Sequence, residues 1–542
     1  MSPNPDDRPE QTNDAEELAR QIASKSRQIK ALQREVAQLE QRQRQMKRRQ
    51  MVQVPALPSV PTAEASKRTS IHSLSKRFEY SLLALLVLVA FLIRVYQLGS
   101  FPDTVLADEA DNAQDSIRIL YGSPPVNGFF GLDWTNQPAF SAYKEAAFIA
   151  LFGFSIFAMR LSSAVISTLA LIPFYILLRR QFSIAASALA TVLLATDVWY
   201  LNFSRSGWNC IDVCFYMLMA MLFLLWGGDA VTSATPGWKK WALFAGAGFF
   251  CALGLYGYPP GRAITLAVVA FLPIMWLSQG SHAKTFFLGY LLLLATEAIV
   301  FAPQVVYVVK HWEKFNGRSK VVLIFNDPAY QANPVATMWQ QLNRNIRGPW
   351  DGRVNNTAQY SPVGEPQFDK ITGGLTLAGM ALALFLKRLR TKPETWLWWL
   401  MLLSGWGLTQ LLTVGTPNGA RGIGYMPTLV YFAGVGIEEL VLLMGRISAT
   451  TDVFPILRQF SFAILVAVIL VAGYINVKHY VDWQSMPQTR KDRHLYVTAR
   501  EFPEWSAMIV DLASNKANIT NVEQWRAAHP IQDIANPYGI SP

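Results

Sequence analysis

The chain has 542 residues, of which 51% are hydrophobic and 16% are charged. So few charges among so many apolar residues argue against a soluble globular protein and predict an all-helical protein that crosses a membrane many times. The formal net charge of +11 does not indicate a nucleic-acid partner, because the basic residues lie where membrane topology requires them.

The part of the chain before the first hydrophobic span divides into three segments. Residues 1–17 are polar and are predicted to be disordered. Residues 51–78 are rich in Pro, Ser and Thr and predict a flexible linker. Between them, in 18–50, apolar residues recur at heptad spacing: Leu18, Ile22, Ile29, Leu32, Val36, Leu39 and Met46. Segment 18–50 is either a cytoplasmic coiled coil that forms a dimer or recruits a partner, or a solvated single helix.

Hydrophobic stretches approaching the roughly 20 residues that a membrane span needs begin at residue 80. The first is not a secretory signal peptide, because it lies far from the N-terminus and no small-residue cleavage pattern follows it. About eleven spans are expected, at 80–98, 161–178, 184–199, 211–226, 241–258, 263–277, 285–309, 371–386, 395–414, 425–444 and 460–474. A transmembrane catalytic domain is thus expected over 79–475, followed by a C-terminal segment, 476–542.

The distribution of basic residues predicts the orientation, because cytoplasmic loops collect Lys and Arg near the ends of spans. Basic clusters before the first span, and then at 179–180, 239–240 and 387–392, fall on one side when the spans are threaded in order. The N-terminus is therefore expected in the cytoplasm and 476–542 outside it. The membrane expected is the bacterial inner membrane.

This topology places the loops that carry chemically informative residues outside the cytoplasm, where ATP and sugar nucleotides are poor direct substrates. No Walker sequence or Gly-rich phosphate loop occurs in the chain. The three cysteines, Cys210, Cys214 and Cys251, are expected to be small packing residues, and no Cys/His cluster has zinc spacing. The sequence predicts no metal site and no other cofactor, and a lipid-linked substrate suits an external site best.

An acidic pair, Asp108-Glu109, follows the first predicted span and precedes an amphipathic stretch that ends at Gly122. On one interpretation Asp108 caps that helix, because Asp is a preferred N-cap residue. On the other, a carboxylate held at the membrane surface activates a hydroxyl nucleophile as a general base. The pair alone does not distinguish the two interpretations.

The run from Arg94 to Gly122 resembles the first external loop of the GT-C glycosyltransferases, in particular the protein O-mannosyltransferase and aminoarabinose-transferase branch (glycosyltransferase family 39-like). The resemblance extends over about residues 80–450. It implies a GT-C-like fold that transfers a sugar from a polyprenyl-phosphate donor to an acceptor hydroxyl, with inversion. It further implies that Asp108 is the catalytic base, and that Glu109 orients the acceptor or caps the helix.

Two further stretches bear on this resemblance. Where the family often has a Lys-Pro pair, this chain has Asn136-Gln137-Pro138, so the basic residue is absent and no role is assigned to Gln137. The stretch that contains Arg160 resembles the family's entry into the second span. Arg160 is expected to be a structural anchor at the membrane interface.

Four arginines lie in predicted outer loops, where basic residues are expected to be rare: Arg205, Arg262, Arg318 and Arg421. The planar guanidinium fork matches a phosphate group, so substrate contact is one interpretation, and snorkelling to lipid headgroups is the other. At least two of the four are expected to contact substrate. Arg318 and Arg421 rank first because their loops resemble the family's donor-binding region, and Tyr258, close to Arg262, is a further candidate for substrate binding.

The long outer segment 310–370 is expected to fold over the site as a lid. The sequence therefore predicts a membrane glycosyltransferase whose partners are a polyprenyl-phosphate-linked sugar donor, a lipid, glycan or protein acceptor, and membrane lipid. One alternative is a polytopic transporter or lipid-linked sugar flippase, for which inverted repeats would be expected, and no clear repeat is seen. The other is an oligosaccharyl- or polymer-modifying transferase.

Overall fold

The computed structural model describes residues 76–121, 128–133, 135–233, 236–354, 360–448 and 455–492, together with Gln524, Ala527 and Ala528. The predicted disordered segment, coiled coil and most of the linker and C-terminal segment lie outside the described residues. The described part is helical and contains no strand, with two isolated β-bridges, Leu132–Pro138 and Leu323–Thr413. The all-helical class predicted from the sequence is confirmed for this part of the chain.

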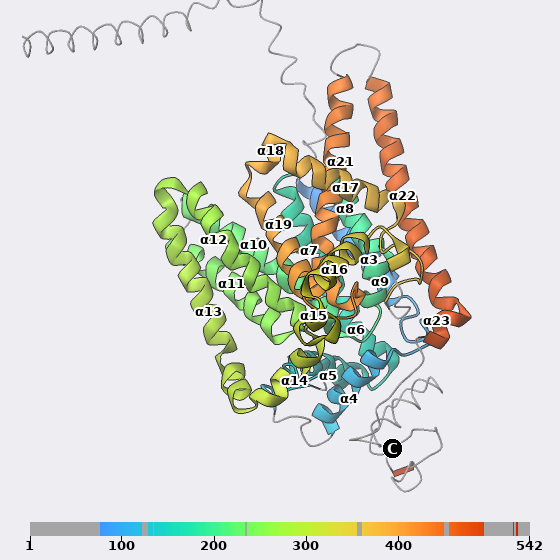
Figure 1. Ribbon diagram of the computed structural model, residues 1–542. Coiled ribbons are helices and arrows are strands. Elements are labelled where there is room, and N and C mark those ends of the chain that lie inside the picture. Colours follow the sequence, from blue (N-terminus) through green and yellow to red (C-terminus); the bar gives the residue numbers. More distant parts are fainter. Residues whose placement is uncertain are drawn as a thin grey trace, which may run out of the picture. The chain divides into compact units, whose positions relative to one another are not determined.

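The described helices are shown in chain order by colour in Figure 1. Their bounds are α3 (Lys76–Val95), α4 (Ala107–Tyr121), α5 (Phe140–Phe152), α6 (Ile156–Leu169), α7 (Leu171–Arg179), α8 (Ile184–Thr196), α9 (Val198–Ser204), α10 (Asp212–Thr232), α11 (Gly237–Tyr256), α12 (Arg262–Ser278), α13 (Ala283–Lys310), α14 (Trp312–Val322), α15 (Pro328–Ala332), α16 (Pro334–Arg347), α17 (Lys370–Phe385), α18 (Lys387–Arg390), α19 (Pro393–Trp406), α20 (Gly419–Gly422), α21 (Met426–Ser448), α22 (Pro455–Ser485) and α23 (Pro487–Asp492).

Helices occupy all of the stretches expected to span the membrane, but the count of eleven is not confirmed. Seven described segments are long and apolar enough to cross a bilayer, or eight if the bent pair α8–α9 forms one span. Helix α17 is apolar but shorter than a span. Helix α22 continues to Ser485, beyond residue 475, where the sequence predicted that the transmembrane domain ends.

The bend of 61° between α8 and α9 has a local cause at Asp197. The Asp197 side chain accepts hydrogen bonds from the backbone N–H groups of Trp199 and Tyr200, so it caps α9. An aspartate that takes up these donors offers the backbone an alternative to a continuous helix. The first helix of the predicted span 184–199 therefore ends at Thr196, and a second short helix, α9, follows it.

The buried core is formed largely by α8, α10 and α21 and by the helices packed on them. Small residues allow backbones to approach: a Cβ on Gly379 of α17 would lie 1.7 Å from the carbonyl oxygen of Phe432 on α21. Likewise, a Cβ on Gly248 of α11 would lie 2.1 Å from the carbonyl oxygen of Leu293 on α13. Such contacts are typical of helix pairs in membranes, where association depends on close packing.

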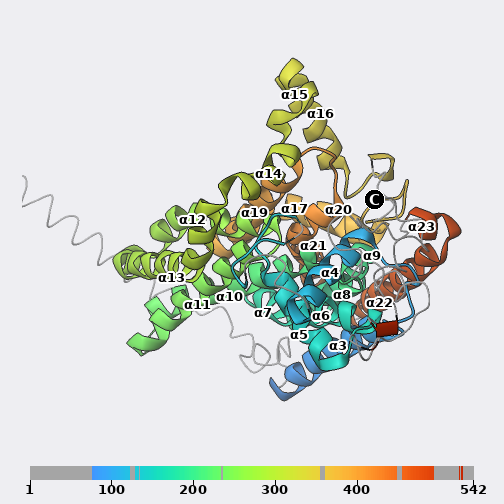
Figure 2. The same ribbon diagram turned by 90° about the horizontal axis from the view of Figure 1, so that it is seen from below.

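Helices α11, α12 and α13 lie together at one edge of the transmembrane unit, and α22 lies at the opposite edge (Figure 1). Helices α4, α5 and α14 lie at the lower end in that view. Seen from that end, α4, α9 and α20 lie near one another, with α15 and α16 projecting to one side (Figure 2). The residues that the sequence analysis selected come from elements that reach this end.

Candidate active site

A cavity of about 220 Å³ opens among the elements at this end. Its walls come from α4, α12, α14 and α20 and from the segments that precede α5, α10, α12 and α20. The lining residues are Asp108, Thr135, Gln137, Trp208, Tyr258, Pro259, Pro260, Arg262, Arg318, Ser319, Val322, Leu323, Leu408, Thr409, Thr413 and Arg421. Five residues selected from the sequence therefore share one cavity, although they are spread over more than 300 positions of the chain.

Asp108 lies in the first turn of α4 and is half-buried. Its Oδ2 accepts a hydrogen bond from the hydroxyl of Tyr360, at 3.3 Å. Burial raises the pKa of Asp108, while the hydrogen bond from Tyr360 and the positive charges of Arg318 and Arg421 lower it, with burial the larger effect. A carboxyl group whose pKa is raised toward neutrality is a better proton acceptor than an ordinary solvated aspartate.

The three arginines that line the cavity differ in how the protein holds them. Arg421 donates from Nη1 to the carbonyl of Val414, at 2.6 Å, and to the hydroxyl of Thr413, at 3.1 Å. Arg262 donates to the side-chain oxygen of Gln137.

Arg262 also lies over the ring of Phe315, with its Cζ 5.1 Å from the ring centroid. The guanidinium group of Arg318, on α14, forms no hydrogen bond or ion pair with the described residues. Three guanidinium groups thus meet one carboxylate, which leaves an excess of positive charge suited to an anionic ligand.

Glu109, the neighbour of Asp108, points away from this cavity and is fully buried. It forms an ion pair with Arg160, in which Nε lies 2.7 Å from Oε1, and both side chains are inaccessible to solvent. It also accepts hydrogen bonds from the backbone N–H groups of Gly207 and Leu106, at 2.8 and 3.2 Å. The bond to Leu106 is the contact that the helix-capping interpretation requires.

Arg160 contributes more than the interface contact expected from the sequence. It donates from Nη1 to the carbonyl of Pro102, at 2.7 Å, and from Nη2 to that of Thr104, at 2.8 Å. These bonds fix the loop that leads into α4. Glu109 and Arg160 together therefore determine how α4 begins, and so direct Asp108 toward the cavity.

Arg205 also lies outside the cavity and is buried. Its Nη1 and Nη2 atoms donate to the carbonyls of Ile93, Arg94, Tyr96 and Phe101, at 2.7 to 2.9 Å. These carbonyls lie at the end of α3 and just beyond it, where helix termini leave acceptors without partners. These hydrogen bonds join the end of α9 to the end of α3, and Arg205 is not among the residues that line the cavity.

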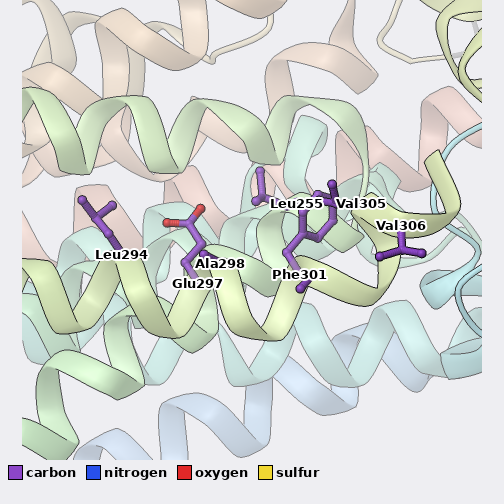
Figure 3. Close-up of a pocket in the computed structure, with 8 residues that line it drawn as sticks. Leu255, Leu294, Glu297, Ala298, Phe301, Val305 and Val306 are labelled. Carbon is purple, nitrogen blue, oxygen red and sulfur yellow. The ribbon is translucent and has the colours of Figure 1, made fainter. Parts of the chain in front are cut away.

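A second cavity, of about 530 Å³, lies between α11 and α13 (Figure 3). Leu255 comes from α11, and the remaining lining residues lie along α13: Leu294, Glu297, Ala298, Phe301, Ala302, Val305 and Val306. Apart from Glu297 these side chains are apolar. None of the residues selected from the sequence lies here, so the smaller cavity is the better candidate for an active site despite its size.

The structure adds residues to the site that the sequence analysis did not select. Tyr360 belongs to the long outer segment, and nothing in its local sequence distinguishes it from an interfacial tyrosine. Gln137 stands where a related sequence would have a basic residue, and it contacts Arg262 instead. The sequence did contain a feature that singles out Gln137, because glutamine departs from the Lys-Pro pair that the family often has at this position.

The fold and the cavity define a polytopic membrane protein with an arginine-lined site. Residues 136–307 match the family model described as dolichyl-phosphate-mannose-protein mannosyltransferase. A curated relative, the undecaprenyl phosphate-alpha-4-amino-4-deoxy-L-arabinose arabinosyl transferase of Pseudomonas aeruginosa (strain UCBPP-PA14), is 26% identical over 368 residues, which are 65% of this chain and 64% of the relative. The match thus covers less than two thirds of the relative's length.

Solved structures with a similar arrangement include ArnT from Cupriavidus metallidurans bound to undecaprenyl phosphate, with a TM-score of 0.48, 13% identity, and coverage of 82% of this chain and 79% of that one. Another is the archaeal oligosaccharyltransferase AglB from Archaeoglobus fulgidus, with a TM-score of 0.48, 13% identity, and coverage of 84% and 59%. The family model and the curated relative confirm the resemblance to GT-C glycosyltransferases that the sequence predicts.

Proposed function

We propose that the protein is a membrane glycosyltransferase that moves a sugar from a polyprenyl-phosphate-linked donor to an acceptor hydroxyl. The observation that carries the proposal is the single cavity in which Asp108 meets Arg262, Arg318 and Arg421. The carboxylate supplies a base and the guanidinium groups supply a phosphate site, and these are the two requirements of the reaction. The match to a mannosyltransferase family and the similarity to an arabinosyl transferase support the same class of chemistry.

The proposed step is one displacement at the anomeric carbon of the donor sugar. Asp108 accepts the proton of the acceptor hydroxyl while the hydroxyl oxygen forms the new bond to carbon. The bond between that carbon and the lipid-phosphate oxygen breaks, and its electron pair leaves with the phosphate. The arginines stabilise the negative charge that develops there. A single displacement inverts the anomeric centre, and the acceptor hydroxyl takes the place that water has in an inverting glycosidase.

The size of the cavity bears on the substrate. Ligand pockets commonly have volumes of roughly 300–1,000 Å³, whereas this cavity has about 220 Å³. It therefore favours transfer of a monosaccharide over transfer of an oligosaccharide. The direct test incubates purified protein with labelled polyprenyl-phosphate sugars and a membrane extract. Label transferred to a lipid, glycan or protein identifies the acceptor, and no transfer with any donor would overturn the proposal.

In the proposed orientation, the N-terminus lies in the cytoplasm of a bacterial cell and the active site lies on the extracytoplasmic side of the inner membrane. Accessibility tags inserted in 387–392 should be cytoplasmic, and tags in 340–360 and 500–540 should be external, because basic residues are retained on the cytoplasmic side. Membrane-impermeant labelling of intact cells and of inverted vesicles measures this. Labelling of 340–360 from the cytoplasmic side would refute the external active site.

Replacement of Arg318 by alanine should weaken binding of a polyprenyl-phosphate donor about tenfold to a hundredfold, because charge-assisted hydrogen bonds to phosphate contribute roughly 1.5–3 kcal/mol. Arg421→Ala should have a similar effect. Titration of the detergent-purified protein with a polyprenyl phosphate measures both. The control is Arg353→Ala, which removes an exposed arginine paired with Asp351. Equal affinities in all three variants would exclude the phosphate role of Arg318 and Arg421.

A further inference from the structure

Tyr360 brings a hydroxyl to Asp108 from 252 positions further along the chain. It lies between α16 and α17, in the outer segment that the sequence predicts to cover the site. Its Oη lies 3.3 Å from Oδ2 of Asp108 and donates a hydrogen bond to that carboxylate. The contact joins the outer segment directly to the proposed base.

The surroundings of Tyr360 hold its ring in one place. The ring packs against Trp208 and Phe203, with centroids 5.7 and 5.9 Å away. Its carbonyl accepts a hydrogen bond from Nδ2 of Asn202, at 3.2 Å. Gly419 approaches from the other side so closely that a Cβ there would lie 2.9 Å from the Cβ of Tyr360. A hydroxyl fixed by such packing can fix the group that it contacts.

The ionisable groups near Asp108 come from several elements and act in opposite directions. Arg318 and Arg421 favour the ionised carboxylate of Asp108, whereas the charge of Asp108 disfavours ionisation of Asp111 on the same helix. Burial and the carboxylates of Asp108 and Asp115 raise the pKa of Asp111 to about 7. The ionisable neighbours of Asp108 are Asp111, Cys210, Tyr258, Arg318, Tyr360 and Arg421.

Binding of a phosphate-linked donor changes this balance. The negative charge of the phosphate offsets Arg318 and Arg421, so their stabilising effect on ionised Asp108 is reduced when the donor is in place. The hydrogen bond from Tyr360 does not involve the phosphate and persists. Tyr360 then becomes the main remaining partner that favours the charged form of the base.

We propose that Tyr360 is a positioning residue for Asp108, which keeps the carboxylate ionised and oriented while the donor phosphate occupies the arginines. This inference rests on the proposed function, in which Asp108 is the base. It assigns to the outer segment a part in the reaction beyond covering the site.

The test replaces Tyr360 by phenylalanine, which keeps the ring and removes the hydroxyl. Loss of a hydrogen bond to the ionised form raises the pKa of Asp108, so the acidic limb of the rate profile should move to higher pH. In the pH profile of kcat, we expect the acidic limb to move by about half to one pH unit, since the contact is a single, rather long hydrogen bond. The profile of kcat reports the enzyme with donor bound, and that of kcat/KM reports the free enzyme. The shift in kcat should therefore be the larger of the two.

Tyr330→Phe is the matched control, because it removes the same atom from α15 at a ring that packs against Phe325. Its profiles should coincide with those of the unmodified protein. An unshifted acidic limb in Tyr360→Phe, whether activity is kept or falls equally at every pH, would overturn the positioning role. If Asp108→Asn retains activity, the proposed base is wrong instead, so the two failures are distinguishable.

Discussion

Asp108→Asn should lower turnover by roughly 100-fold or more, the usual contribution of a positioned acid or base. Asparagine keeps the size of the side chain, and the contact that caps α4, from the N–H of Leu106 to Glu109, is unchanged, so the helix should form as before. It loses the negative charge and almost all basicity. Donor binding should persist, because Arg262, Arg318 and Arg421 are unchanged. Turnover with a labelled donor, together with donor titration, measures both effects.

The control for Asp108→Asn is Asp115→Asn, seven positions along the same helix. Asp115 forms an ion pair with Arg118, at 3.4 Å, and does not line the cavity. It should leave turnover close to that of the unmodified protein. Full activity in Asp108→Asn would mean that the base lies elsewhere.

Arg160→Met should reduce the free energy of unfolding by about 3–5 kcal/mol, since it leaves the carboxylate of Glu109 buried without its charged partner. Both side chains of this pair are completely inaccessible to solvent, so water cannot replace the guanidinium group. The start of α4 should loosen as well, because Arg160 holds the carbonyls of Pro102 and Thr104. Chemical unfolding in detergent, followed by tryptophan fluorescence, measures the loss.

A matched comparison for this buried pair is the ion pair of Arg180 and Asp229, in which the Asp229 side chain is 57% exposed. Asp229→Asn should cost at most about 1 kcal/mol, because exposed ion pairs contribute little. A loss of stability in Arg160→Met no larger than that in Asp229→Asn would show that Glu109 finds another partner or takes up a proton.

From the sequence, Asp108, Arg318 and Arg421 could be predicted to lie on the same side of the membrane, because threading the spans in order places their loops at one face. The resemblance to the family singles out Asp108 among the acidic residues there. It was not sufficient for Arg205. A basic residue in an outer loop has the same signature whether it meets a substrate or the carbonyls at the end of a helix. The distinction depends on α3 ending beside α9, which is a matter of packing.

The acidic pair illustrates a second limit of local sequence. Asp108 and Glu109 are adjacent, so a helix directs them about 100° apart and sends them to different environments. The one lines the cavity, and the other meets Arg160, 51 positions away. Tyr360 was missed for the same reason, because its role depends on a contact 252 positions distant. The ends of the spans were also predicted less accurately than the spans themselves, because they depend on side-chain contacts such as the cap at Asp197.

Helix α9 has consequences for which insertions and deletions this chain can tolerate. Within α9, Asn202 forms hydrogen bonds to the carbonyl of Tyr360 and to the side chain of Gln484. Arg205, the residue after α9, donates hydrogen bonds to carbonyls at the end of α3. These two anchors are three positions apart and share one face of the helix. Adding or deleting one residue after Asp197 would rotate both by about 100°. The outer segment, α22 and α3 would lose their common attachment at once, so variation in length should be absent from this stretch and confined to the connections around it.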